Sequence, residues 1–322
     1  MGVNSEAEAP SSITDRVDRW LQLRPLAWAS LVANGVLVVT GGAVRLTASG
    51  LGCPTWPRCT STSLAPQHGA MDIHSVIEFS NRMLTFVLAA IAIATFIAAW
   101  RTGRRDLRRI TLLMGLGIPA QAVIGGITVL TDLNPWVVSF HLLCSLAIIG
   151  LSVVLLDRID HPEPTIARGP VVGLAWATFA AAWLVLYLGT VVTGSGPHAG
   201  DLKSKRNGLD PLQVSQLHAD VVFLFVGLTI GLLFAAVATH ASAQARTAVV
   251  VLLGLEVSQG AIGFVQYFTG LPVVLVGFHM LGAALISASV TWVLLSVRSP
   301  RETARQRVSS GSSATVTNNS DR

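Results

Sequence analysis

Eight apolar segments of roughly 20 residues recur along the chain, and each is long enough to cross a lipid bilayer as a helix. Only 12% of the residues are charged, about half the fraction of a soluble domain, and the mean hydropathy is +0.61. Because a helix satisfies its own backbone hydrogen bonds in a bilayer, the sequence predicts an all-α integral membrane protein with eight transmembrane helices. The expected helices lie at about 26–46, 75–100, 110–131, 136–156, 171–193, 213–238, 247–268 and 273–297.

The positive charges between these segments gather on one side of the predicted membrane. Arginines cluster in the stretch 101–109 and in both terminal segments, all on the same side. The positive-inside rule makes that side cytoplasmic, so we expect a multi-pass protein of the cell membrane with both termini in the cytoplasm. Lys203, Lys205 and Arg206 oppose this trend. The net charge of +5 therefore reflects membrane topology, and we expect lipid rather than nucleic acid as the partner of this surface. The first segment lacks a small-residue cleavage site, so we expect an anchor rather than a removed signal peptide.

Two stretches of the chain match in register. Residues 121–141 read QAVIGGITVLTDLNPWVVSFH and residues 259–279 read QGAIGFVQYFTGLPVVLVGFH. Each has a Gln, a Gly four residues later, an apolar run, a short Pro turn and Phe-His. Weaker matches join the ends of the first and fifth segments and the starts of the second and sixth. The pattern predicts a tandem repeat of four helices.

The repeat sets the expected architecture and its boundaries. Because four is an even number, both halves have the same orientation, and a pseudo-twofold axis along the membrane normal relates them. We expect two tandem four-helix bundles, at 25–160 and 161–298, with cofactors in their interiors. The polar segments 1–24 and 299–322 are predicted to be disordered on the cytoplasmic side.

Two histidines of the second half are the strongest candidate ligands. His218 and His279 lie at similar predicted depth, five to six residues inside the outer ends of two different helices. Neutral imidazoles hold haem iron axially, so such a pair could clamp one haem. A lone intramembrane His more often bonds a carbonyl across helices. The repetition, and the cost of ionisable groups in a membrane, favour ligands here.

The first half offers an unequal set of residues at the same level. His141 is the counterpart of His279, but Asn81, a poor iron ligand, occupies the place of His218. This half therefore supplies at most one strong axial bond and leaves room for chemistry. Glu78 lies on the Asn81 face of its helix, where it could move protons or stabilise positive charge. The alternative is a plain ion pair between Glu78 and Arg82.

Several other polar residues have weaker signals. Arg45 and Arg82 are the cations nearest the outer side of the first half. Arg pairs well with carboxylates, so both could bind the propionates of a haem. Arg45 could equally be an interfacial residue whose charged end reaches the membrane surface. Gln121 and Gln259 are more simply explained as structural hydrogen-bonding residues. Cys53 and Cys59 share the first outer loop. They lack enough partner ligands for a metal site, and a small disulfide is the better interpretation.

The motifs together resemble the haem A synthase family of bacteria and mitochondria. They are GGAVRLTASGLGCPTWPRC, IEFSNR, the two Gln-to-His stretches, VVTGSGPHAGD and QLHAD, which occur in order over about 25–297. The resemblance implies an eight-helix membrane oxidoreductase. Such an enzyme oxidises the C8 methyl of haem O to the formyl of haem A with a bound haem b as cofactor. It also implies haem O synthase and the assembly of an aa3-type cytochrome oxidase as partners, and it leaves room for a homo-oligomer.

Residue roles can be carried over from the family to matching positions. His218 and His279 match the ligands of haem b, while His141 and Glu78 match the haem O site. Cys53 and Cys59 match an outer-loop pair that resembles a redox-active or structural disulfide. The family motif Glu-x-x-His-Arg has Asn81 in place of its His, which puts bis-His ligation of the substrate haem in doubt. A second cysteine pair, present after the fifth helix in some members, is missing here.

Two other functions fit the same residues less well. One is a diheme b-type electron-transfer protein that oxidises quinol, and the other is a haem chaperone without chemistry. Asn81 in place of a His argues against two symmetric bis-His haems, and so against the diheme protein. Haem extraction separates the three, because only the synthase produces haem A from haem O.

Overall fold

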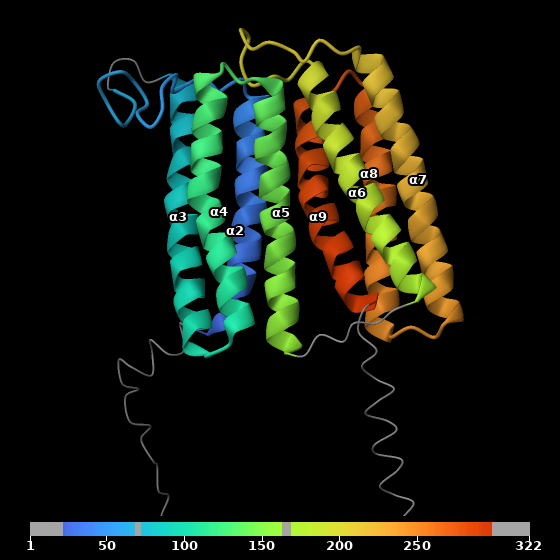
Figure 1. Cartoon of the computed structure of the whole chain (residues 1–322). Coiled ribbons are helices and arrows are strands. Elements are labelled where there is room, and N and C mark those ends of the chain that lie inside the picture. Colours follow the sequence, from blue (N-terminus) through green and yellow to red (C-terminus); the bar gives the residue numbers. More distant parts are fainter. Residues whose placement is uncertain (1–21, 68–71, 163–168, 298–322) are drawn as a thin grey trace, which may run out of the picture.

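The computed structural model describes residues 22–67, 72–162 and 169–297, and this part of the chain is helical with connecting loops (Figure 1). All eight of its helices are long and apolar enough to cross a membrane. The predicted all-α membrane fold is therefore confirmed. The helices are α2 (Leu23–Leu46), α3 (Ile73–Arg101), α4 (Arg105–Leu130), α5 (Pro135–Asp160), α6 (Pro170–Ser195), α7 (Pro211–Ala238), α8 (Ala243–Phe268) and α9 (Val273–Val297).

Most helices extend beyond their apolar runs. For example, α4 begins at Arg105, about one turn before the expected start near residue 110, and α5 ends at Asp160 rather than near 156. A helix continues into its charged flanking turn because the backbone hydrogen bonds still form there and the side chains reach water. Leu23 and Arg24 also belong to α2, although residues 1–24 were expected to be disordered. The predictions for 1–21 and 299–322 concern residues outside the described part of the chain.

Each half of the chain forms a ring of four neighbouring helices. In the first half α2 contacts α3 and α5, and α4 also contacts α3 and α5; in the second half α6 and α8 both contact α7 and α9. The two groups stand side by side in Figure 1. Between them α5 contacts α6 and α9, and α2 contacts α9. This pattern of neighbours agrees with two tandem bundles, while the pseudo-twofold axis and the 25–160 and 161–298 boundaries remain predictions.

Small residues and hydroxyls join the two halves. The Ser287 hydroxyl of α9 donates to the carbonyl of Leu146 on α5 (2.8 Å). One turn along α5, a Cβ at Gly150 would lie 3.1 Å from Thr291 Oγ1. Close approach at small residues is typical of helix contacts in membranes, where burial of apolar surface does not favour association. The halves are therefore in direct contact over α5 and α9.

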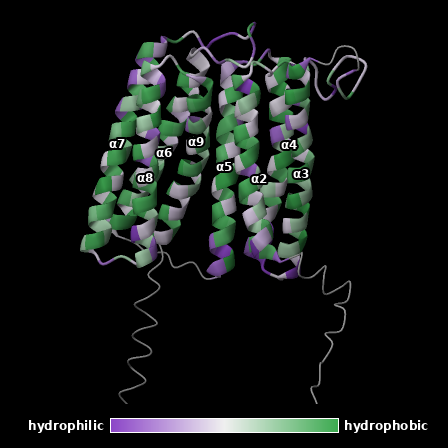
Figure 2. Cartoon of the chain, turned by 180° about the vertical axis from the view of Figure 1, so that it is seen from behind, coloured by the Kyte–Doolittle hydropathy of each residue, from purple (hydrophilic) through white to green (hydrophobic). Residues whose placement is uncertain are grey.

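The outer surface of the helices is apolar. Large side chains such as Phe86, Phe234 and Phe268 are 69%, 72% and 78% exposed. Figure 2 shows hydrophobic residues along the helices and hydrophilic ones mainly at the helix ends and in the loops. In a soluble protein such a surface would mark an interaction site, whereas here it covers the whole bundle. The surface fits lipid contact, as expected for a multi-pass membrane protein.

Candidate functional site

The four candidate residues from the two halves lie near the same end of the molecule. This end carries the loop with Cys53 and Cys59, and we call it the disulfide end. The helices α3, α5, α7 and α9 all begin there. Asn81, His141, His218 and His279 follow the starts of these helices by six to eight residues, or about 9–12 Å of helical rise. This depth agrees with the sequence-based expectation.

Proline and a capping residue set the start of two of these helices. The Asn134 side chain accepts a hydrogen bond from the Trp136 N–H (3.0 Å), with Pro135 as the first residue of α5. The Asp210 side chain likewise accepts from the Leu212 N–H (2.8 Å), with Pro211 opening α7. A cap followed by Pro fixes where a helix begins, because Pro has the helical φ and needs no hydrogen-bond acceptor. The heights of His141 and His218 follow from these starts.

Each candidate side chain packs against a glycine of the preceding helix. A Cβ would lie 3.3 Å from His141 Cε1 if added at Gly125, 3.3 Å from His218 Cε1 at Gly189 and 3.6 Å from His279 Cε1 at Gly263. In the first half, a Cβ at Gly41 would lie 3.9 Å from Asn81 Nδ2. The glycines therefore give each ring room between helices. Gly125 and Gly263 belong to the two repeated stretches of the sequence. The contact between Gly189 and His218 was not predicted from the sequence and is seen only in the structure.

The two histidines of the second half lie on helices that are diagonal to each other. Among the described residues, α7 and α9 make no direct contact, and both contact α6 and α8. Gly189 of α6 and Gly263 of α8 flank the rings of His218 and His279. This is the arrangement that could hold a flat macrocycle between two axial ligands.

The imidazole nitrogens have few protein partners. The Nδ1 atoms of His141, His218 and His279 are buried without a hydrogen bond from any described residue. The Val185 backbone lies beside the His218 ring without forming a well-aligned bond to Nδ1. Buried polar atoms usually find a partner, so three unpartnered Nδ1 atoms at one level are unusual for histidines with a purely structural role. Histidines flanked by glycines fit axial ligation of haem. The described part of the chain contains no cluster of three or more His, Cys, Asp or Glu residues for a bare metal ion.

Glu78 and Arg82 attach the first outer loop to α3. Glu78 is 5% exposed, and its carboxylate accepts hydrogen bonds from the Cys53 N–H (2.7 Å) and from Arg82 Nε (3.1 Å). Arg82 also donates to the carbonyls of Cys53 (2.9 Å), Thr55 (3.1 Å) and Arg58 (3.3 Å). The ion pair anticipated from the sequence is present. It anchors the loop, so Arg82 is committed to loop carbonyls as well as to Glu78.

The predicted disulfide joins Cys53 to Cys59 in this loop. The loop also places the Trp56 ring directly on α4, because a Cβ at Gly126 would lie only 2.4 Å from Trp56 Cδ2. Gly126 is the neighbour of Gly125, which contacts His141. The loop therefore reaches the wall of the first-half site. Trp56 and Gly126 are far apart in the sequence, so only the tertiary structure brings the ring onto this glycine.

Enlarging Gly126 should lift the loop off the bundle. We expect Gly126→Ala to displace the Trp56 ring, since no heavy atom can remain 2.4 Å from the new methyl group. Trypsin should then cut faster after Arg58, by about tenfold if the loop opening becomes about 1.4 kcal/mol easier. The control is Gly115→Ala on the same helix, where an added Cβ meets nothing within 4 Å. Equal cleavage of both variants would contradict this arrangement.

Arg45 connects the first half to the second. Its Nε donates to the His198 carbonyl (2.6 Å) and its Nη2 to the Thr193 carbonyl (2.8 Å). The His198 Nε2 in turn lies 3.0 Å from the Leu271 carbonyl of the α8–α9 turn. Nearby, the Gly50 N–H donates to the Gly200 carbonyl (2.8 Å). In this structure Arg45 thus bonds backbone carbonyls rather than extending into lipid headgroups, and its role toward propionates remains a prediction.

Removing Arg45 should destabilise the contact between the halves. We expect Arg45→Leu to lower the free energy of unfolding by about 1.5–3 kcal/mol, because two partly buried carbonyls lose a charged donor. Arg24→Leu is the matched control, since its 3.2 Å ion pair with Asp160 is exposed and should cost less than about 1 kcal/mol. Thermal unfolding in detergent measures both. An equal loss in the two variants would argue against the bridging role.

The repeated glutamines have structural contacts. Gln121 Nε2 donates to the His141 carbonyl (3.0 Å) and to the Ser145 hydroxyl. Gln259 fills the space beside Gly282, where a Cβ would overlap its amide. Each glutamine therefore contacts the helix that carries the histidine of its own half, α5 for Gln121 and α9 for Gln259. These contacts agree with the structural role expected from the sequence.

Comparison with known proteins points to one family. Residues 24–200, more than half of the chain, match the family described as cytochrome oxidase assembly protein. The heme A synthase of Staphylococcus epidermidis is 24% identical over 300 residues, which cover 86% of this chain and 97% of that protein. The heme A synthases of Bradyrhizobium sp. and Halalkalibacterium halodurans are 28% and 29% identical, over 52% and 51% of this chain. These two alignments span 56% and 58% of the relatives' own lengths, so the chain matches little more than half of them.

Proposed function

This chain belongs to the cytochrome oxidase assembly protein family, and from that premise we propose that it is an oxidoreductase that converts haem O to haem A. The Staphylococcus epidermidis relative named heme A synthase aligns over 97% of its length, which supports this activity. The observation that carries the proposal is the pairing of four polar residues with four glycines at one level, with three imidazoles on three different helices.

The second bundle would hold the cofactor haem b. His218 and His279 are the proposed axial ligands, with Gly189 and Gly263 leaving room for their rings. When bound, haem b supplies one-electron transfer to the reaction. The chain's own contribution is to orient the two imidazoles diagonally across the bundle and to exclude water with the packed residues around Phe225 and Leu252.

The first bundle would bind the substrate, haem O. His141 is the proposed ligand of its iron, and Asn81 leaves the opposite side without a second histidine. The propionates would face the disulfide end, where Arg45 and Arg82 lie. Two successive hydroxylations of the C8 methyl, together a four-electron oxidation that needs an external oxidant such as dioxygen or an electron acceptor, would give a hydrate that loses water to form the formyl group. We propose that Glu78, next to the site, moves protons or stabilises positive charge during these steps.

Haem extraction tests the proposed function against its rivals. The full chain is purified after co-expression with a source of haem O, and its pigments are extracted and separated. A haem A synthase yields haem A together with haem b. Bound haem b without haem A under these conditions would favour a diheme electron-transfer protein, and haem O bound but unchanged would favour a chaperone. A colourless protein would refute all three.

The proposal also places the protein in its cellular setting. Haem O synthase would supply the substrate, and the assembly of an aa3-type oxidase would take up the product. Both termini would be cytoplasmic, and the disulfide end would face outward, where a disulfide persists. A cysteine introduced in either tail and labelled with a membrane-impermeant reagent tests this orientation, since labelling in intact cells would contradict it.

A further inference from the structure

A buried carboxyl group in the second bundle has no part in the site described above. Glu256 lies in the middle of α8 and is 3% exposed. Its Oε1 accepts a hydrogen bond from the Thr229 hydroxyl of α7 (2.6 Å). Its Oε2 is buried and has no partner among the described residues. An ionisable group inside a membrane is costly, so a residue of this kind calls for a functional explanation.

No positive charge from the described residues faces this carboxyl group. Glu256 takes part in none of the ion pairs of the described chain. The helices packed against α8 are α7 and α9, whose titratable groups are His218, Asp220 and His279, all in the first turns at the disulfide end. On α8 itself, Arg246 precedes Glu256 by ten residues, or about 15 Å of helical rise. Tyr267, near the disulfide end, follows it at a similar distance. A carboxylate without a cation is strongly disfavoured in such surroundings, so the uncharged acid is the favoured form as long as the histidine site carries no positive charge.

The face of α8 that carries Glu256 also carries two glutamines and the glycine beside the His279 ring. Gln259, Gly263 and Gln266 follow it at three, seven and ten residues, spacings that keep side chains on the same face of a helix. Gly263 is in contact with the His279 ring, and Gln266 Oε1 is buried without a partner, like Glu256 Oε2. Glu256 therefore lies about 10 Å below the level of His279, at the inner end of a line of polar groups.

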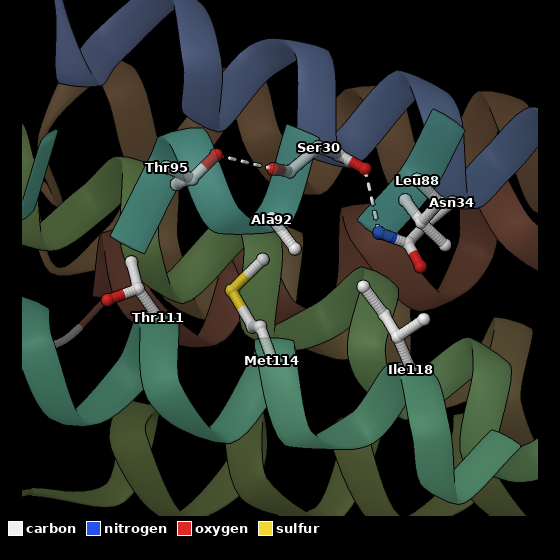
Figure 3. A pocket seen from close by; sticks show the side chains of 8 residues that line it. All are labelled: Ser30, Asn34, Leu88, Ala92, Thr95, Thr111, Met114 and Ile118. Atoms are coloured by element: carbon white, nitrogen blue, oxygen red, sulfur yellow. Dashed lines mark hydrogen bonds between the residues drawn. The ribbon is translucent and has the colours of Figure 1, made fainter. Parts of the chain in front are cut away.

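In the described part of the first bundle, Ile118 rather than an acid occupies the place that corresponds to Glu256. A small cavity there is lined by polar and apolar side chains of α2, α3 and α4 (Figure 3). Its polar members are Ser30, Asn34, Thr95 and Thr111, with a hydrogen bond between Ser30 and Thr95 (3.1 Å). These groups stay neutral at all ordinary pH values. Of the two corresponding positions, only that of Glu256 carries a titratable group, and it lies in the half in which we place haem b.

We propose that Glu256 is a proton-exchanging residue coupled to the redox state of the group held by His218 and His279. The positive charge of the oxidised site favours the ionised carboxylate. Glu256 therefore takes up one proton from water when one electron from a reductant enters that site, and it releases the proton when the electron leaves. The charge of the electron and that of the proton then cancel inside the bundle. At a separation of about 10 Å in a low dielectric, the two charges interact strongly enough for this coupling. The coupling rests on the proposed haem b site, whereas the neutral state of Glu256 does not.

Infrared spectroscopy tests the neutral state without any haem. The full chain, purified free of haem, should show a C=O stretching band of a protonated carboxylic acid that persists at neutral pH. The band should disappear in Glu256→Gln and shift in Thr229→Val, which removes the hydrogen-bond donor but keeps the acid. Asp132→Asn, a change at an exposed turn residue with positive φ, should leave it unchanged. Absence of the band in the unmodified chain, or its persistence in Glu256→Gln, overturns the proposal.

Redox titration of the bound haem b from pH 6 to pH 10 tests the coupling. The oxidised site favours the ionised carboxylate, so its proton leaves at lower pH than in the reduced state. The midpoint potential should therefore fall with rising pH over that interval, by at most about 59 mV for each tenfold change in proton concentration. Glu256→Gln should flatten this dependence, and Asp132→Asn should preserve it. An unchanged slope in Glu256→Gln overturns the coupling, while a colourless protein instead refutes the proposed haem site and leaves the infrared result standing.

Discussion

Replacing His218 or His279 with alanine is expected to remove bound haem b and with it the formation of haem A. Each substitution deletes one proposed axial ligand and leaves a space beside Gly189 or Gly263 that no neighbouring side chain fills. We expect the ratio of haem b to purified protein to fall by at least about tenfold, which corresponds to about 1.4 kcal/mol of lost binding. The absorption spectrum and extracted haem of the purified variants measure this.

A histidine outside the site provides the control for this experiment. His240 is exposed at the end of α7 and has a positive φ, which Asn tolerates well. His240→Asn should therefore retain the spectrum of the unmodified protein. If His218→Ala and His279→Ala folded and kept their full haem b content, the assignment of the axial ligands would be wrong.

Replacing Glu78 with alanine is expected to stop haem O conversion while haem b stays bound. The substitution removes a buried carboxylate of the first bundle and leaves the second bundle intact. It also removes the acceptor of the Cys53 N–H and the partner of Arg82, so the loop carrying Trp56 loses an anchor. We expect the rate of haem A formation to drop by about 100-fold or more, as for loss of a general acid or base.

The conservative variant separates the two roles of Glu78. Glu78→Gln can still accept a hydrogen bond from Cys53, but it carries no charge and cannot move a proton. Full activity in Glu78→Gln would assign Glu78 to anchoring the loop alone, and loss of activity with normal resistance of the loop to trypsin would assign it to the chemistry. Normal haem A output from Glu78→Ala, with unchanged haem b content, would exclude both roles.

Periodicity and composition were enough to predict the fold class and the level of the site. The apolar segments located all eight helices, because a spanning helix needs about 20 apolar residues whatever its neighbours are. The repeated Gln-to-His stretches placed His141 and His279 at equal depth, since distance along a helix is proportional to residue number. The ends of the helices were less well predicted, because charged turns such as Arg105–Arg109 are helical without being apolar.

Contacts between distant segments were not predictable in this way. Arg45 was equally compatible with a propionate partner and with a lipid-facing side chain, and the structure places it on carbonyls of the other half. Nothing in the sequence around Trp56 predicted that its ring packs on Gly126. Such contacts depend on how loops fold over the bundle, and no local propensity encodes that geometry.

The sequence alone determined which residues are buried in the membrane and at what height they stand, because hydrophobicity and helical rise are local properties of the chain. Only the tertiary structure decided which of them face each other. His218 and His279 become a pair because α7 and α9 are diagonal in a ring of four helices. Among the described residues Glu256 faces no cation, because the two helices packed against α8 carry no Lys or Arg. Rotation of a helix about its axis is set by packing against its neighbours, and that information exists only once all eight helices are assembled.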